Sequence, residues 1–187
     1  MVDGEVLEFG VSGLLHQANM LMYDRCTESL WQQSIGEAVV GEFTGTVLDI
    51  LPMQLISFGE LKEKYPEAKV LSQNTGAERD YTRNPYSGYE FLDSVPFGVE
   101  SPDDRYFPKK AMYVFRAGDI SVAFPYEDLP DAGASTTIAG REVMAERDGE
   151  EVFVTVDGER VPGYVEMWFS FSIQHGEDGE VWEVGAE

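Results

Sequence analysis

Short β-branched runs separated by glycine turns fill the second half of the chain, and they constrain the fold more than any other feature. The runs lie at residues 111–116, 120–124, 136–138, 141–146, 152–156 and 160–161. The turns between the later runs carry Ala139-Gly140, Asp148-Gly149 and Asp157-Gly158. Asp-Gly between two apolar runs is the strongest short-range hairpin signal, because such turns need positive φ angles. The pattern predicts hairpins that continue into a meander.

The first half of the chain adds further strands and a single helix. Its apolar runs lie at residues 5–11, 19–24, 38–40, 46–51 and 70–72, with glycine or proline near their ends. Ser57 stands three residues before Glu60, which is a capping box, and Pro66 follows as a helix stop. We therefore expect a mainly β protein of the α+β class, with antiparallel strands and hairpins and one short helix near 58–65.

Two segments resist a simple assignment. Residues 73–110 form a long irregular loop rich in tyrosine and proline, and loops of that length are uncommon and often functional. The alternative is that the aromatic side chains only pin the loop onto the sheet. The last apolar segment, YVEMWFSFSIQH at 164–175, fits a strand by its alternation and a helix by its 3.6-residue face.

The length and the hydropathy of the chain limit the number of domains and the expected location of the protein. A chain of 187 residues suits a single domain over 1–187. No apolar run approaches the roughly 18 residues of a membrane helix. The first residues, MVDGEVLEFG, have neither the basic region nor the apolar core of a signal peptide. As it stands, the chain is therefore expected to be cytoplasmic. The oligomeric state is not indicated.

The charge is extreme: 35 acidic residues stand against 13 basic ones, which gives a net charge of −22. Acidic surfaces with few lysines suit proteins that work in molar salt, where the Debye length falls to about 3 Å. We therefore expect a protein from a halophile. The same charge argues against nucleic acid and anionic membranes as partners, because both are bound by basic surfaces.

Sequence motifs for catalysis or metal binding are sparse. A lone Cys26 excludes an internal disulfide, and one cysteine with two histidines cannot form a cysteine-rich zinc site. His16 and His175 do not share a metal-ligand spacing, so no metal is predicted, although they are the available histidine ligands. The chain has no serine-nucleophile elbow, phosphate-binding glycine loop or HExxH helix, and no cofactor is predicted. Whether the chain is an enzyme is left open.

Polar and aromatic side chains concentrate in two places, the first block and the long loop. The candidate ligand-binding residues are Asp24, Arg25, Trp31, Gln33, Arg79, Asp80, Tyr81, Arg83 and Tyr86. In so acidic a chain, neighbouring aspartate and arginine residues suggest planar ion pairs. These pairs either anchor the loop, as we expect for Asp80, or line a cleft for an unidentified small molecule or protein, as we expect for Arg83 and Tyr86.

Several blocks of the chain resemble one known family. The blocks are GVSGLLHQANMLMYDRCTESLWQQSIGEAVVG, LPMQLISFGELKEKYPEAKVLS, TGAERDYTRNPYSGY, AMYVFRAGDISVAFPYEDL and MWFSFSIQHGEDGEVWE. Together they are similar to the proteins grouped as domain of unknown function 3179. Two departures stand out: His16 replaces a usual tyrosine, and the family's upstream half, with a Cys-Pro-Leu-Cys segment, is absent from this chain.

The resemblance carries no activity with it, and it leaves two hypotheses. In the first, the chain is a non-catalytic binding domain with a polar-aromatic cleft. In the second, it is the C-terminal part of a metal- or thiol-dependent redox protein or enzyme whose reactive residues lie upstream. The resemblance also implies that many full-length relatives are exported or lipid-anchored.

We predict that the fold depends on salt. Lowering KCl from molar concentrations to about 0.1 M lengthens the Debye length from about 3 to about 10 Å, so the carboxylates repel one another more strongly. The melting temperature, followed by circular dichroism across a KCl titration, should therefore fall as the salt is removed. An unchanged melting temperature at low salt would contradict a halophilic origin.

Overall fold

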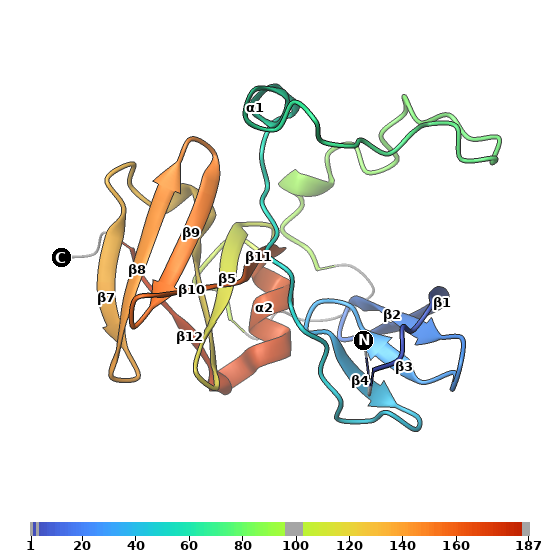
Figure 1. Ribbon diagram of the computed structural model, residues 1–187, viewed down its shortest axis with the longest axis horizontal. Helices are drawn as coiled ribbons and strands as arrows, with labels where there is room; N and C mark the ends of the chain where they lie inside the picture. Colours follow the sequence, from blue (N-terminus) through green and yellow to red (C-terminus); the bar gives the residue numbers. More distant parts are fainter. Residues whose placement is uncertain (1, 3, 96–102, 185–187) are drawn as a thin grey trace.

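The computed structural model describes residue 2, residues 4–95 and residues 103–184, and its strands form three four-stranded sheets (Figure 1). The first sheet has the order β1-β2-β3-β4 and is antiparallel throughout. Its strands are β1 Phe9–His16, β2 Asn19–Asp24, β3 Leu30–Gln32 and β4 Glu37–Val40. The protein is mainly β, as the sequence predicts.

The central sheet has the order β11-β5-β6-β12. Its strands are β5 Ala111–Ala117, β6 Ile120–Pro125, β11 Gly163–Met167 and β12 Gly179–Val181, of which β12 runs parallel to β6. The third sheet has the order β10-β9-β8-β7. It consists of β7 Ala134–Ile138, β8 Arg141–Asp148, β9 Glu151–Val156 and β10 Glu159–Val161. This sheet is the predicted meander, and its strands lie close to the predicted ranges.

The helices are few and short. They are α1 Phe58–Lys64 and α2 Trp168–His175, with 3-10 turns η1 Tyr89–Phe91, η3 Tyr126–Asp128 and η4 Gly176–Asp178. Among the described residues, none of the helices is long and apolar enough to cross a membrane.

Alternation along β5 places its side chains in two separate hydrophobic layers. Tyr113 and Phe115 pack in the cluster shared with the third sheet, whereas Met112 and Val114 pack in the cluster that contains Trp168 of α2. The central sheet is therefore covered on both faces, by the third sheet and by α2. The first sheet has a core of its own, and Figure 1 shows it on the far side of α2.

The predicted helix near 58–65 is confirmed, and half of its capping box is present. The Ser57 hydroxyl accepts a hydrogen bond from the Glu60 amide at 3.2 Å. The Glu60 carboxylate does not return to Ser57 but accepts from the Glu150 amide at 2.9 and 3.0 Å. The same side chain that would complete the cap therefore attaches α1 to the turn between β8 and β9.

Other expectations need correction. Residues 46–51 are not a strand, because they contribute only an isolated bridge from Val47 to Glu37, and residues 70–72 are also irregular. Beside this bridge, the Ala38 amide donates to the Thr46 carbonyl and the Leu48 amide donates to the Gly36 carbonyl, so the pairing with β4 is too short to form a strand. Residues 70–72 lie in an extended connection. The ambiguous segment at 164–175 is strand first and helix second, with the change at Met167. In the predicted loop, η1 is the sole helical turn among described residues 73–95, and residues 96–102 lie outside the described part.

Hydrogen bonds attach the connection between the first sheet and α1 to β11 and to β9. The Met53 amide donates to the Gly163 carbonyl at 2.9 Å. The Gln54 amide group donates to the Val152 carbonyl at 2.8 Å and accepts from the Val152 amide at 2.9 Å. The Tyr113 hydroxyl donates to the same carbonyl at 3.1 Å. The Gln54 side chain thereby pairs with the backbone of β9 as a residue of a neighbouring strand would.

We predict that Gln54→Ala lowers the free energy of unfolding by about 2 kcal/mol, because it leaves the buried Val152 amide without an acceptor. Urea denaturation in molar KCl measures the change. Gln73→Ala, in the exposed loop, is the matched control and should stay within about 0.5 kcal/mol of the parent. Equal losses in the two variants would show that Gln54 does not hold this connection.

Candidate functional site

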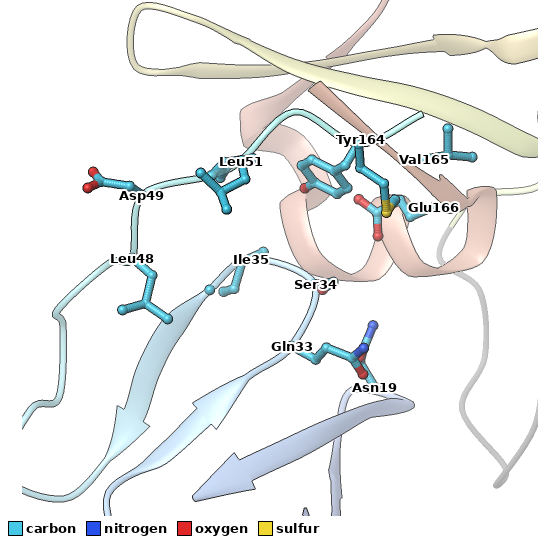
Figure 2. Close-up of a pocket in the computed structure, with 13 residues that line it drawn as sticks. Asn19, Gln33, Ser34, Ile35, Leu48, Asp49, Leu51, Tyr164, Val165 and Glu166 are labelled. Carbon is cyan, nitrogen blue, oxygen red and sulfur yellow. The ribbon is translucent and has the colours of Figure 1, made fainter. Parts of the chain in front are cut away.

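A cavity of about 450 Å³ lies between the first sheet and β11. We call it the Glu166 cavity. Its walls comprise Asn19 at the start of β2, Gln33–Gly36 in the turn between β3 and β4, 48–51 and Met53 of the connection, and Tyr164–Glu166 of β11. Figure 2 shows Tyr164 and Glu166 on the side of β11 and α2, facing Asn19, Gln33 and Ser34 across the opening. Two parts of the chain far apart in sequence therefore build one concave site.

Glu166 is the unusual member of this wall. It pairs with Met112 in the strand register, so its side chain leaves the sheet on the side of α2. Both carboxylate oxygens are buried, and neither has a hydrogen bond of normal geometry with a described residue. Burial raises the pKa of Glu166 to about 7, although the nearby Ser170 and Tyr164 hydroxyls oppose the rise. Glu166 is thus an acid that changes charge near neutral pH.

Tyr164 lies on the same face of β11 and lines the same cavity. Burial raises the pKa of its phenol well above the usual range, and the charge on Glu166 adds to the effect. The phenol therefore stays neutral and keeps its proton. Tyr164 can donate a hydrogen bond in the cavity but does not act as a base.

His175, Tyr164 and Arg116 line a separate small cavity of about 30 Å³. The Nε2 atom of His175 is buried without a hydrogen-bond partner among the described residues. Burial lowers the pKa of His175 to about 4, and the positive charge of Arg116 lowers it further. The imidazole is therefore neutral at physiological pH. The Arg116 guanidinium donates to the Asp119 carbonyl at 3.1 Å.

Two of the predicted binding residues, Asp24 and Trp31, serve the first sheet instead of lining this cavity. The buried Asp24 carboxylate accepts from the Trp31 indole at 3.0 Å and from the amides of Cys26 and Thr27 at 3.1 and 2.7 Å. Although burial opposes the effect, these hydrogen bonds hold the pKa of Asp24 below its usual value. The contacts close the turn between β2 and β3 and fix the Trp31 ring in the core of the first sheet.

Arg25 and Gln33, from the same block, lie in different settings. Arg25 is exposed and forms an ion pair with Glu8 at 2.9 Å. Gln33 lines the Glu166 cavity, and it is the one predicted ligand-binding residue that does so. The free Cys26 is exposed at the turn after β2.

The predicted loop residues are exposed and make local contacts. The Arg79 guanidinium lies over the Tyr81 ring at 5.8 Å, and the Asp80 carboxylate accepts from the Thr82 amide at 3.0 Å. Arg83 is exposed, as is Tyr86, whose ring packs edge-on to Tyr89. Figure 1 shows this part of the chain projecting from the body, well apart from the first sheet. The structure does not bring the loop and the first block together in one cavity.

The two histidines considered as metal ligands lie apart as well. His16 is exposed at the end of β1, and His175 ends α2. Among the described residues, no group of three His, Cys, Asp or Glu side chains is placed to hold a metal ion.

The sequence analysis missed Glu166, Tyr164 and Asn19. One signal was available: Glu166 is the single charged residue in the apolar run YVEMWFSFSI, and alternation places it on the same side as Tyr164. A charged residue inside a buried run needs either a compensating partner or a functional role. The cavity opposite it cannot be inferred in this way, because it depends on how the first sheet docks.

Comparisons with known proteins identify one family. A family model described as "Protein of unknown function (DUF3179)" matches residues 1–160. No curated protein and no solved structure matches the chain.

We predict that Glu166 makes stability fall as the pH rises. The unfolded chain releases this proton near pH 4.5 and the folded protein near pH 7, so the folded state binds more protons between these values. The lost stability amounts to about 3 kcal/mol above pH 7. Glu166→Gln should remove this loss, so the variant gains stability over the parent from pH 5 to pH 8.

Urea denaturation at a series of pH values measures this difference. Comparison with the parent is needed because His175, whose folded pKa is lowered, makes stability rise with pH below about 6.5. Glu180→Gln, at an exposed position of β12, is the control and should follow the parent. A constant difference between Glu166→Gln and the parent at all pH values would contradict the prediction.

Proposed function

The chain belongs to the DUF3179 family, whose description assigns no function, and we propose that it is a small-molecule binding domain with the Glu166 cavity as its site. One observation carries the proposal. Both Glu166 oxygens are buried in the wall of a cavity and lack hydrogen bonds of normal geometry with described residues. The Ser170 and Tyr164 hydroxyls near Glu166 favour its charged form but do not offset its burial. A carboxylate buried in this way lowers stability, so a folded protein that retains it needs a compensating use for it.

The dimensions and the chemistry of the cavity support the same proposal. Its volume of about 450 Å³ falls in the range of small-molecule sites. Ile35, Leu48, Leu51 and Val165 supply apolar surface, and the polar groups of the wall are those of Asn19, Gln33, Ser34, Asp49, Tyr164 and Glu166. An apolar wall with a small number of polar groups is the usual design of such sites.

General acid–base catalysis is a second candidate, because the pKa of Glu166, at about 7, suits proton transfer. Binding is favoured over it, because Asp49, the other carboxylate in the wall, lies at the opposite end of the cavity from Glu166 (Figure 2). The Tyr164 phenol keeps its proton, and His175 lines the separate small cavity.

The solvent in which this binding takes place is also part of the proposal. With a net charge of −22, the protein is suited to concentrated salt, where its carboxylates are screened. Binding measurements therefore belong in molar KCl. A buried carboxylate is screened much less than the surface charges and keeps its local influence there.

We predict that Nile red, a neutral apolar dye, binds in the Glu166 cavity. Leu51→Trp fills part of this cavity and should weaken dye binding about tenfold, which corresponds to about 1.4 kcal/mol. Fluorescence titration in molar KCl measures the affinity. Leu71→Trp is the matched control, because Leu71 is another exposed leucine outside the cavity, and it should bind the dye like the parent.

Two outcomes would contradict the proposed site. One is dye binding that Leu51→Trp leaves unchanged. The other is an equal loss in both tryptophan variants, which would place the dye on exposed apolar surface in general.

A further inference from the structure

We propose that the ligand is an aliphatic primary amine, held as an ammonium ion by the Glu166 carboxylate, with its hydrocarbon chain in a second cavity beside that residue. This inference rests on the proposed function, because it places the amine in the same site and adds the chemical class. It follows from the shape on either side of Glu166 and from its buried oxygens, which have no hydrogen bond of normal geometry with a described residue.

The second cavity has a volume of about 230 Å³ and shares Met53, Val165 and Glu166 with the first. These three residues therefore stand at the boundary between the two spaces. Beyond them, the second cavity is walled largely by apolar side chains, those of Leu55, Ala111 and Met167. A ligand whose polar group meets Glu166 thus has an apolar space into which a hydrocarbon chain can extend.

Lys109 also borders the second cavity, but its ammonium group is engaged elsewhere. It lies over the rings of Tyr89 and Phe169 at 4.8 and 5.2 Å, and it donates to the Ser94 carbonyl at 2.5 Å. Long cationic side chains commonly present their aliphatic stem to apolar surface while the charged end is held apart. Lys109 therefore does not supply the positive charge that Glu166 lacks.

An ammonium ion matches Glu166 better than other polar groups of similar size. It brings a full positive charge and three N–H donors to two acceptor oxygens, and hydrogen bonds between charged groups are roughly twice as strong as neutral ones. An alcohol brings one donor and no charge, and a carboxylate is repelled.

The affinity for an amine should depend on pH through Glu166, since its protonated form cannot pair with an ammonium ion. The other polar groups around it include Tyr164 on β11, Ser170 on α2 and Asp49 in the connection, and Lys109 borders the second cavity. His175 and Arg116 face the small cavity behind Tyr164. The Tyr164 phenol and the His175 imidazole stay neutral near pH 7, so the change in charge there is that of Glu166.

The test is competition with Nile red by three probes of equal chain length: hexylamine, hexanol and hexanoate. All titrations are made in molar KCl at pH 6 and pH 8, where an alkylamine stays protonated. We expect hexylamine to compete best, and to compete about tenfold better at pH 8 than at pH 6. The preference for hexylamine over hexanol should disappear in Glu166→Gln, with each probe compared against that variant's own affinity for the dye, and should persist in Glu180→Gln.

The outcomes separate this inference from the proposed function. If Leu51→Trp weakens dye binding but hexanol competes as well as hexylamine, the cavity is a binding site and the amine is wrong. If Leu51→Trp leaves dye binding unchanged, the cavity is not the dye site and the proposed function itself is wrong, whatever the three probes show. Should Glu166→Gln fold poorly, the parent protein still decides: equal competition by hexylamine at pH 6 and pH 8 would overturn the role of Glu166.

Discussion

Burial of both faces of the β5–β6 hairpin is the constraint on which the rest of the structure depends. Side chains of one face, including Phe115 and Phe124, form a common core with the third sheet, while Met112, Val114 and Ala123 meet α2 on the other. Two strands with no polar face must be covered twice, so the chain supplies a sheet for one side and a helix for the other. The positions of β11 and α2, and with them the site, follow from this requirement.

The strand β11 passes directly into α2 at Met167, with no loop between them. The helix therefore folds back over the face of β11 that carries Tyr164 and Glu166, and Asn19 of the first sheet donates to Ser170 of α2 at 3.2 Å. Glu166 is enclosed by the strand that carries it, the helix that follows and the first sheet. Its burial is thus a property of the tertiary structure, although its position in the chain looks ordinary for an edge strand.

Local signals predicted local structure well. Ser57 and Glu60 located α1, and the glycine turns located the strands of the third sheet, because short-range hydrogen bonds and positive φ angles decide both. The expectation for residues 46–51 failed because the run pairs with β4 only around Val47, and β-branched residues favour extended backbone without ensuring continued strand pairing. Gln33 is the residue that links the predicted candidates to the cavity. Glu166 and Asn19 could not be paired in advance, because their proximity depends on how two sheets meet.

The two walls of the Glu166 cavity belong to different hydrophobic cores: Leu48 packs with the core of the first sheet, and Val165 packs with that of the central and third sheets. This division has an evolutionary consequence. Substitutions that shift the docking of the first sheet can widen or narrow the cavity while both cores keep their packing. The size of the cavity can therefore change among descendants of this chain at little cost in foldability, whereas the position of Glu166 is set by β11.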